Sequence, residues 1–133
     1  MLGRMPTVDT IMSRDVLSVP PDTTIAAAAK RMSGGRVGAV VVLDGGKLAG
    51  ILTERDVLRV VGEGRVEGST VADWMTRDPD TIEPSESTDM AATLMIHGGF
   101  RHLPVVEDGT VVGIVSIRDL MRVVLDDAAP RGV

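Results

Sequence analysis

The chain contains no cysteine and no tyrosine, and it has a single tryptophan and a single phenylalanine. Without cysteine, a disulfide framework, thiol catalysis and cysteine-ligated zinc are excluded. Aromatic residues make up only 2% of a sequence that is 44% hydrophobic. The core must therefore be built from Val, Ile, Leu, Met and Ala, and 133 residues are enough to bury one without covalent staples.

An excess of positive charge is also lacking, because the formal net charge is -5. This argues against nucleic acid as a partner, since such binding relies on neutralising phosphates, and any phosphate site must be a local basic patch. No apolar run approaches the roughly 20 residues that span a bilayer, and the N-terminus lacks the layout of a signal peptide. We therefore expect a cytoplasmic protein with no membrane partner.

Signatures of catalysis are missing as well. The sequence offers no convincing pair of nucleophile and base, no His-rich metal spacing and no Walker-type loop. We expect a protein that is not an enzyme, that has no catalytic or metal-binding residues, and that requires no cofactor.

One duplicated segment organises what is present. Residues 50–56 read Gly-Ile-Leu-Thr-Glu-Arg-Asp, and residues 113–119 read Gly-Ile-Val-Ser-Ile-Arg-Asp. A shift of 63 positions superimposes them, and it also places Met12 on Met75 without a gap. A period this long indicates two copies of one supersecondary unit. We predict a lead-in (1–7), a first repeat (8–61), a linker (62–70), a second repeat (71–124) and a tail (125–133).

Each copy reads as a mixed α/β (α+β) unit. In the first, a short strand over 16–19 is followed by a helix capped by Thr23 or Thr24, and the helix ends at Gly34-Gly35. A β-branched run then turns at 44–47 and returns as a strand before a second helix. Because one copy is too small to bury its sheet face, we expect the copies to pack on each other with pseudo-twofold symmetry.

The duplicated motif ends each hairpin at a hydroxyl residue, Thr53 or Ser116. A hydroxyl there caps the following helix, and the free N–H groups of the first turn favour an anion. The spacing to Asp56 and Asp119 is equally that of a capping box, which stabilises a helix start without any ligand. The glycines that open the motif, Gly50 and Gly113, favour a ligand site, because a strand glycine often marks close approach by a backbone or a ligand.

Several arginines are candidate phosphate contacts. Arg55 and Arg118 lie in a first helical turn, where the dipole disfavours a cation by roughly 0.3 to 1 kcal/mol. A phosphate would offset this, and a surface ion pair, for example with Glu54, is the alternative. Arg101 is a further candidate, because the first repeat has Gly38 at that position.

Other polar and aromatic residues have plainer interpretations. We expect Arg59 and Arg122 to be solvated or to pair with the acids three positions before them, Asp56 and Asp119. Trp74, the only indole, is expected to be a core or interface side chain.

These features together resemble a CBS-domain pair, also called a Bateman module. The resemblance rests on Gly-h-h-Ser/Thr-x-x-Asp (h, hydrophobic) appearing twice in one register, and on Phe100–Val106 before the second hairpin. It covers about residues 8–124. It implies that each repeat has a mainly three-stranded sheet with flanking helices, that ligands bind in clefts between the repeats, and that the pair forms a homodimer.

The resemblance also implies roles for individual residues. Thr53 and Ser116 would contact phosphate or ribose, and Asp56 and Asp119 would bind the ribose hydroxyls. The aligned residues Ser18 and Thr81 are further candidate ligand contacts, with a strand-edge hydroxyl as the alternative. Ligands in such proteins include AMP, ADP, ATP and S-adenosylmethionine, and some members bind none.

We therefore expect a ligand-binding regulatory module that senses adenine nucleotides or a related adenosyl ligand. The alternative is a ligand-free structural or adaptor dimer that acts through protein–protein contacts. The identity of the ligand, the number of occupied clefts, the dimer geometry and the regulated protein partner stay open at this point.

Overall fold

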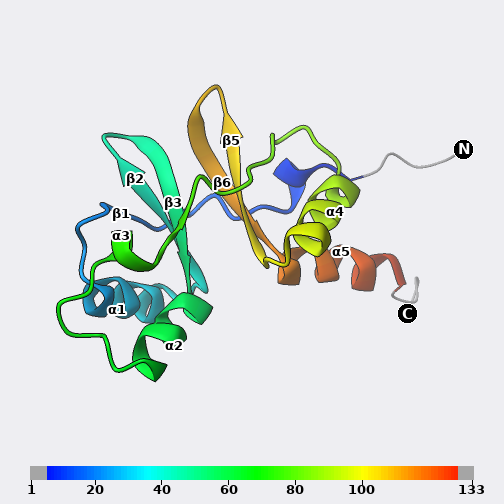
Figure 1. Ribbon diagram of the computed structural model, residues 1–133. Coiled ribbons are helices and arrows are strands. Elements are labelled where there is room, and N and C mark those ends of the chain that lie inside the picture. Colours follow the sequence, from blue (N-terminus) through cyan, green and yellow to red (C-terminus); the bar gives the residue numbers. More distant parts are fainter. Residues whose placement is uncertain (1–5, 129–133) are drawn as a thin grey trace, which may run out of the picture. The chain divides into compact units, whose positions relative to one another are not determined.

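The computed structural model describes residues 6–128, with side chains described up to residue 125 (Figure 1). Most of the predicted lead-in and part of the predicted tail lie outside this range. The chain divides into two units. The first-motif unit is Asp15–Pro79, which contains residues 50–56, and the second-motif unit combines the described residues up to Arg14 with those from Asp80 onward. Each unit therefore holds most of one repeat together with the opening segment of the other repeat.

The first-motif unit is built on a four-stranded sheet in the order β1-β2-β3-β4. Its elements are β1 (Ser18–Val19), α1 (Ile25–Gly35), β2 (Ala39–Asp44), β3 (Lys47–Thr53), α2 (Glu54–Gly62), α3 (Val71–Trp74) and β4 (Thr76–Arg77). Strand β1 is parallel to β2, whereas β2 with β3 and β3 with β4 are antiparallel. The three strands expected within a repeat are thus joined by a fourth from the second repeat.

The second-motif unit follows the same plan. Its elements are the 3-10 helix η1 (Val8–Thr10), α4 (Thr88–Gly98), β5 (His102–Glu107), β6 (Thr110–Ser116) and α5 (Ile117–Ala128). Strands β5 and β6 form an antiparallel hairpin. Ile82 bridges to Val105 in parallel and Ser13 bridges to Ile114 in antiparallel fashion, so single residues stand where the other unit has β1 and β4.

The long helices begin at hydroxyl residues that the repeat places in register. The Thr24 side chain accepts a hydrogen bond from the Ala27 N–H at 3.1 Å, and the Ser87 side chain accepts one from the Met90 N–H at 3.1 Å. Such caps satisfy donors that have no partner within the helix. The prediction that Thr23 or Thr24 caps the first helix is confirmed for Thr24.

Helix α3 is short and carries a capping box of its own. The Asp73 carboxylate accepts hydrogen bonds from the Thr70 N–H at 2.9 Å and from the Thr70 hydroxyl at 3.2 Å. These two bonds, more than the nearby arginines, lower the pKa of Asp73 below its ordinary value. The start of α3 is therefore sensitive to acid.

Each unit has its own apolar core, and the two cores use matching positions. The first contains Val19, Ile25, Ala28, Met32, Val40, Val42, Leu52, Val60, Val71 and Met75. The second contains Val8, Ile82, Ala91, Met95, Leu103, Val105, Val115 and Leu120. Val71 belongs to the first core and Val8 to the second, so the opening segments of the two repeats are exchanged between the cores.

No helix within residues 6–128 is both long enough and apolar enough to cross a bilayer. The cytoplasmic location expected from the sequence stays a prediction.

Candidate functional site

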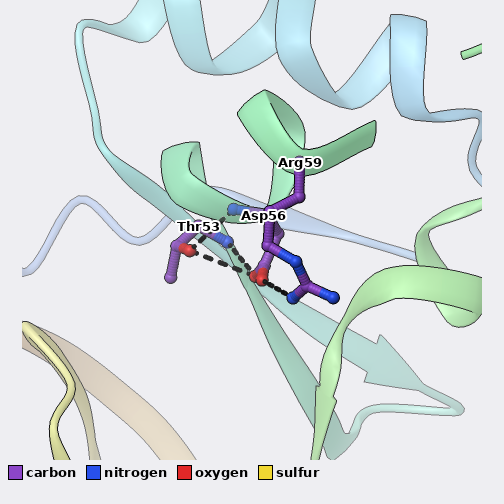
Figure 2. A network of polar contacts seen from close by, with 3 residues as sticks. All are labelled: Thr53, Asp56 and Arg59. Carbon is purple, nitrogen blue, oxygen red and sulfur yellow. Dashed lines mark hydrogen bonds and ion pairs between the residues drawn. The ribbon is translucent and has the colours of Figure 1, made fainter. Parts of the chain in front are cut away.

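The first copy of the motif forms a complete capping box where β3 passes into α2 (Figure 2). Asp56 Oδ2 accepts hydrogen bonds from the Thr53 N–H at 2.9 Å and from the Thr53 hydroxyl at 3.1 Å. In return, the Asp56 N–H donates to Thr53 Oγ1 at 3.3 Å. Arg59 Nη1 lies 3.5 Å from Asp56 Oδ1, at the outer limit of a hydrogen bond. Both carboxylate oxygens of Asp56 therefore have partners from the chain itself.

The second copy has the same box with fewer contacts. Asp119 Oδ2 accepts from the Ser116 N–H at 2.8 Å, and the Asp119 N–H donates to Ser116 Oγ at 3.2 Å. Arg122 Nη1 lies 3.9 Å from Asp119 Oδ1, which is ion-pair distance but too long for a hydrogen bond. The Asp119 side chain is 18% exposed, compared with 10% for Asp56.

In both units the motif helix is anchored to the residue that immediately precedes the first strand of the hairpin, β2 or β5. The first N–H of α2, at Glu54, donates to the Gly38 carbonyl at 2.9 Å, and the first N–H of α5, at Ile117, donates to the Arg101 carbonyl at 2.9 Å. Arg101 thus contributes its backbone to the start of α5, and its side chain is exposed. Its predicted contact with phosphate stays a prediction.

Each motif glycine is closely approached by the segment that its unit receives from the other repeat. A Cβ added at Gly50 would lie 2.7 Å from Met75 Sδ and 2.7 Å from the Thr76 carbonyl oxygen. A Cβ added at Gly113 would lie 2.5 Å from Met12 Sδ. Close approach by a neighbouring segment therefore accounts for both glycines, and a further role in ligand binding stays a prediction.

The arginines of each motif helix separate into two kinds. Arg59 and Arg122 pair with the acid three positions earlier, as the sequence predicts. Arg55 and Arg118 are exposed, and neither forms an ion pair within the residues whose side chains are described. The surface pair suggested as an alternative for Arg55 is thus not formed with Glu54, and both side chains are free to meet an anion from solvent.

Trp74 adds a contact that the sequence analysis missed. Its ring packs partly buried against the first core, and the guanidinium carbons of Arg59 and Arg65 lie 5.6 Å and 5.8 Å from the ring centroid. Both distances are within the range of a cation–π interaction. Arg59 therefore contacts the motif carboxylate and the indole at once. Its separation of 15 positions from Trp74 follows no helical or strand spacing, so no sequence pattern signals the contact.

The remaining predicted contacts are Ser18, which lies in β1, and Thr81, which aligns with Ser18 but lies outside the strands. Ser18 begins β1 and its carbonyl accepts a hydrogen bond from Arg31 Nη1 at 2.7 Å. Thr81 is exposed and precedes the residue that bridges to β5. The structure places Ser18 in the unit of Asp56 and Thr81 in the unit of Asp119. Within the described part of the chain, no group of three His, Cys, Asp or Glu residues could hold a metal ion.

The functional groups of each motif can support ligand binding. Each motif holds a carboxylate, an acceptor for hydroxyl groups, beside a helix N-terminus whose N–H groups and dipole favour an anion. An exposed arginine stands in the same helical turn. A ligand that carries both a diol and an anionic group fits these functional groups.

Comparison with known proteins gives a consistent result. The family model described as CBS domain matches residues 8–63 and again residues 71–126. The CBS domain-containing protein YhcV of Bacillus subtilis is 37% identical over 117 residues, which cover 87% of this chain and 84% of that protein. The resemblance read from the duplicated motif is confirmed.

Two solved structures that this chain resembles hold adenosyl compounds. The CBS domain pair of protein MJ0100, in complex with 5'-methylthioadenosine and S-adenosyl-L-methionine, has a TM-score of 0.87 and 28% identity, and the match covers 93% of this chain and 99% of that one. CBSX2 of Arabidopsis thaliana, in complex with AMP, has a TM-score of 0.79 and 27% identity, covering 92% and 98% of the two chains.

Proposed function

Because the chain belongs to the CBS-domain family, we propose that it is a regulatory module that senses adenine nucleotides or a related adenosyl ligand. The observation that carries the proposal is the duplicated carboxylate at a helix start, in a family whose solved members include complexes with AMP and with S-adenosylmethionine. A module of this kind binds and does not catalyse. AMP, ADP, ATP and S-adenosylmethionine are its candidate ligands.

In this proposal each motif holds its ligand by hydrogen bonds to the ribose and by contacts to the anionic group. Asp56 and Asp119 accept the ribose hydroxyls, for which a carboxylate is the matching acceptor. The hydroxyls of Thr53 and Ser116 contact ribose or phosphate.

Residues around the motifs contribute the remaining contacts. Arg55 and Arg118 are exposed one position before the acids and would meet the anionic group of the ligand. We keep Arg101, Ser18 and Thr81 as further contacts, with Arg101 directed at phosphate. Gly50 and Gly113 let a backbone come close, which is compatible with a ligand beside the strand.

Thermal unfolding with and without millimolar AMP, ADP, ATP or S-adenosylmethionine tests the proposal. Ligand at 100 times its dissociation constant stabilises the folded state by about 2.7 kcal/mol, which is a shift of several degrees in Tm for a chain of this size. Asp56→Asn and Asp119→Asn keep the shape of the side chain but remove its charge, and we expect at least one of them to reduce the shift. A chain that binds none of the four ligands in equilibrium dialysis would refute the proposal.

The competing function is a ligand-free adaptor dimer, and one observation favours it. Both motif carboxylates already serve as helix caps without any ligand. If Asp56 and Asp119 serve only as helix caps, each Asp→Asn variant loses only the stability of a cap, about 1 kcal/mol. Added ligand then changes the Tm of neither the wild type nor the variants.

A homodimer is the proposed assembly in either case. Large apolar side chains are exposed at matching positions of α2 and α5: Leu58 at 70%, Val61 at 56%, Met121 at 56% and Val124 at 66%. Because both helices expose the same positions, a second copy offers the matching apolar surface that a twofold interface requires.

Substitution of the exposed apolar residues tests the assembly. Leu58→Glu and Met121→Glu should convert the dimer to monomer in sedimentation equilibrium. Lys30→Glu on the exposed side of α1 is the control and should leave the mass unchanged. A wild-type chain that is monomeric at all concentrations would contradict the proposed assembly.

A further inference from the structure

The two motifs share a sequence pattern but differ in the contacts that the chain itself makes to the motif carboxylate. Asp56 accepts two hydrogen bonds from Thr53 and has Arg59 at 3.5 Å (Figure 2). Asp119 accepts one hydrogen bond from Ser116, and its arginine lies at 3.9 Å. A ribose diol needs two acceptor positions, and the chain's own donors take more of the acceptor positions of Asp56 than of Asp119.

Arg59 is held at Asp56 by a second contact. Its guanidinium carbon lies 5.6 Å from the centroid of Trp74, so the ion pair and the cation–π interaction act on the same side chain. An isolated exposed ion pair on a helix is weak, because the side chains lose freedom and water competes. The indole removes part of that freedom, which makes the pair with Asp56 more persistent than spacing alone provides.

The second unit has no aromatic residue at the position that corresponds to Trp74. A shift of 63 positions places Trp74 on Ile11, which packs against the second core. An isoleucine offers no π face to a guanidinium, so Arg122 has no counterpart of this contact at that position. Arg122 is 69% exposed at its side chain, and Asp119 is left more open to solvent than Asp56.

We propose that the two motifs are unequal ligand sites, with the Asp119 motif binding adenosyl ligand more tightly and the Asp56 motif restrained by Arg59 held on Trp74. This inference rests on the proposed function. Ligand at Asp56 must displace Arg59 from the carboxylate or share it, whereas ligand at Asp119 meets an accessible acceptor. Trp74 and Arg59 are therefore positioning residues that set the affinity of the first motif.

Isothermal titration of the full chain with AMP and with S-adenosylmethionine tests the order of the sites. We expect a tighter and a weaker binding event in the wild type. Asp119→Asn should weaken the tighter event by about tenfold to a hundredfold, the usual effect of losing a hydrogen bond to a charged group, and by more than Asp56→Asn does. A greater loss of the tighter event in Asp56→Asn overturns the inference.

Matched variants test the restraint that Arg59 and Trp74 place on the Asp56 motif. Trp74→Ile gives the first unit the residue of the second, and we expect it, like Arg59→Ala, to tighten the weaker event by about two- to tenfold. Ile11→Trp is the converse change and should weaken the tighter event. Weaker binding of the second ligand by Arg59→Ala would mean that Arg59 contacts the ligand, and would overturn the restraint.

The failures of the two proposals can be told apart. Saturable binding with equal affinity at both motifs, unchanged by Trp74→Ile, overturns the inequality and leaves the proposed function intact. Absence of saturable binding of any adenosyl ligand by the wild type overturns both. Circular dichroism of each variant before titration separates lost binding from lost folding.

Discussion

Replacing Gly50 by alanine should destabilise the first-motif unit by forcing a neighbouring strand away. The new Cβ would lie 2.7 Å from the Thr76 carbonyl oxygen, a backbone atom that cannot rotate aside, and 2.7 Å from Met75 Sδ. Gly50 pairs with Arg77 in the sheet, so any shift also disturbs the pairing of β3 with β4. Overpacking of this kind costs about 1 to 3 kcal/mol.

Urea denaturation followed by circular dichroism measures the effect. We expect a lower midpoint for Gly50→Ala, and in a thermal scan a fall of several degrees in Tm. Gly113→Ala should behave alike, because its Cβ would lie 2.5 Å from Met12 Sδ and 3.0 Å from the Ser13 carbonyl oxygen. Similar losses at both positions would show that the two exchanged segments are seated in the same way.

A helical glycine supplies the control. Gly34 lies in α1 with nothing within 4 Å of an added Cβ, so Gly34→Ala should stabilise the chain by up to about 1 kcal/mol through a better helix propensity. If Gly50→Ala stays within about 0.5 kcal/mol of wild type while Gly34→Ala raises stability, the close approach of the exchanged segment is refuted.

Three further outcomes are expected. The lowered pKa of Asp73 means that the folded state favours the ionised form of this carboxyl. The stability that this adds is present above about pH 4 and is lost as pH falls through the lowered pKa. Asp73→Asn should therefore make the urea midpoint depend less on pH below about pH 4. Ser87→Ala removes the acceptor of the Met90 N–H and should lower the free energy of unfolding by about 1 kcal/mol. Met95→Ala removes a side chain that is only 2% exposed and should lower the free energy of unfolding by about 2 to 5 kcal/mol. Met90→Ala on the same helix, where the side chain is 44% exposed, should change this free energy much less. Equal effects of the two variants in equilibrium unfolding would contradict the core assignment.

Local features could be predicted from the sequence because they depend on residues a few positions apart. Thr24 caps α1, and Arg59 pairs with Asp56 three positions earlier, as helical spacing dictates. The hairpin turn was recognisable for the same reason, since Asp44-Gly45-Gly46-Lys47 brings its own turn chemistry.

The exchange between the units could not be predicted from the pattern. Val8 and Val71 are the same residue at the same repeat position, so hydrophobic spacing cannot tell which one fills which core. The contact between Arg59 and Trp74 was missed because it joins residues from two separate segments. The candidate site was predicted from its duplicated motif, whereas the contact of Arg59 with Trp74, one of the features that distinguish the first copy, joins distant residues.

The seating of each opening segment in the other core makes a single repeat an incomplete folding unit. A chain with only the first repeat would carry Val8 without the core that Val8 fills in the present protein, and its own sheet would lack β4. Two such chains complete each other only by trading these segments, which makes folding depend on protein concentration. Fusion of two copies replaces that dependence with a fixed local concentration, and it frees each copy to diverge. The two copies differ in this way at Glu54, which aligns with Ile117, and at Ile11, which aligns with Trp74.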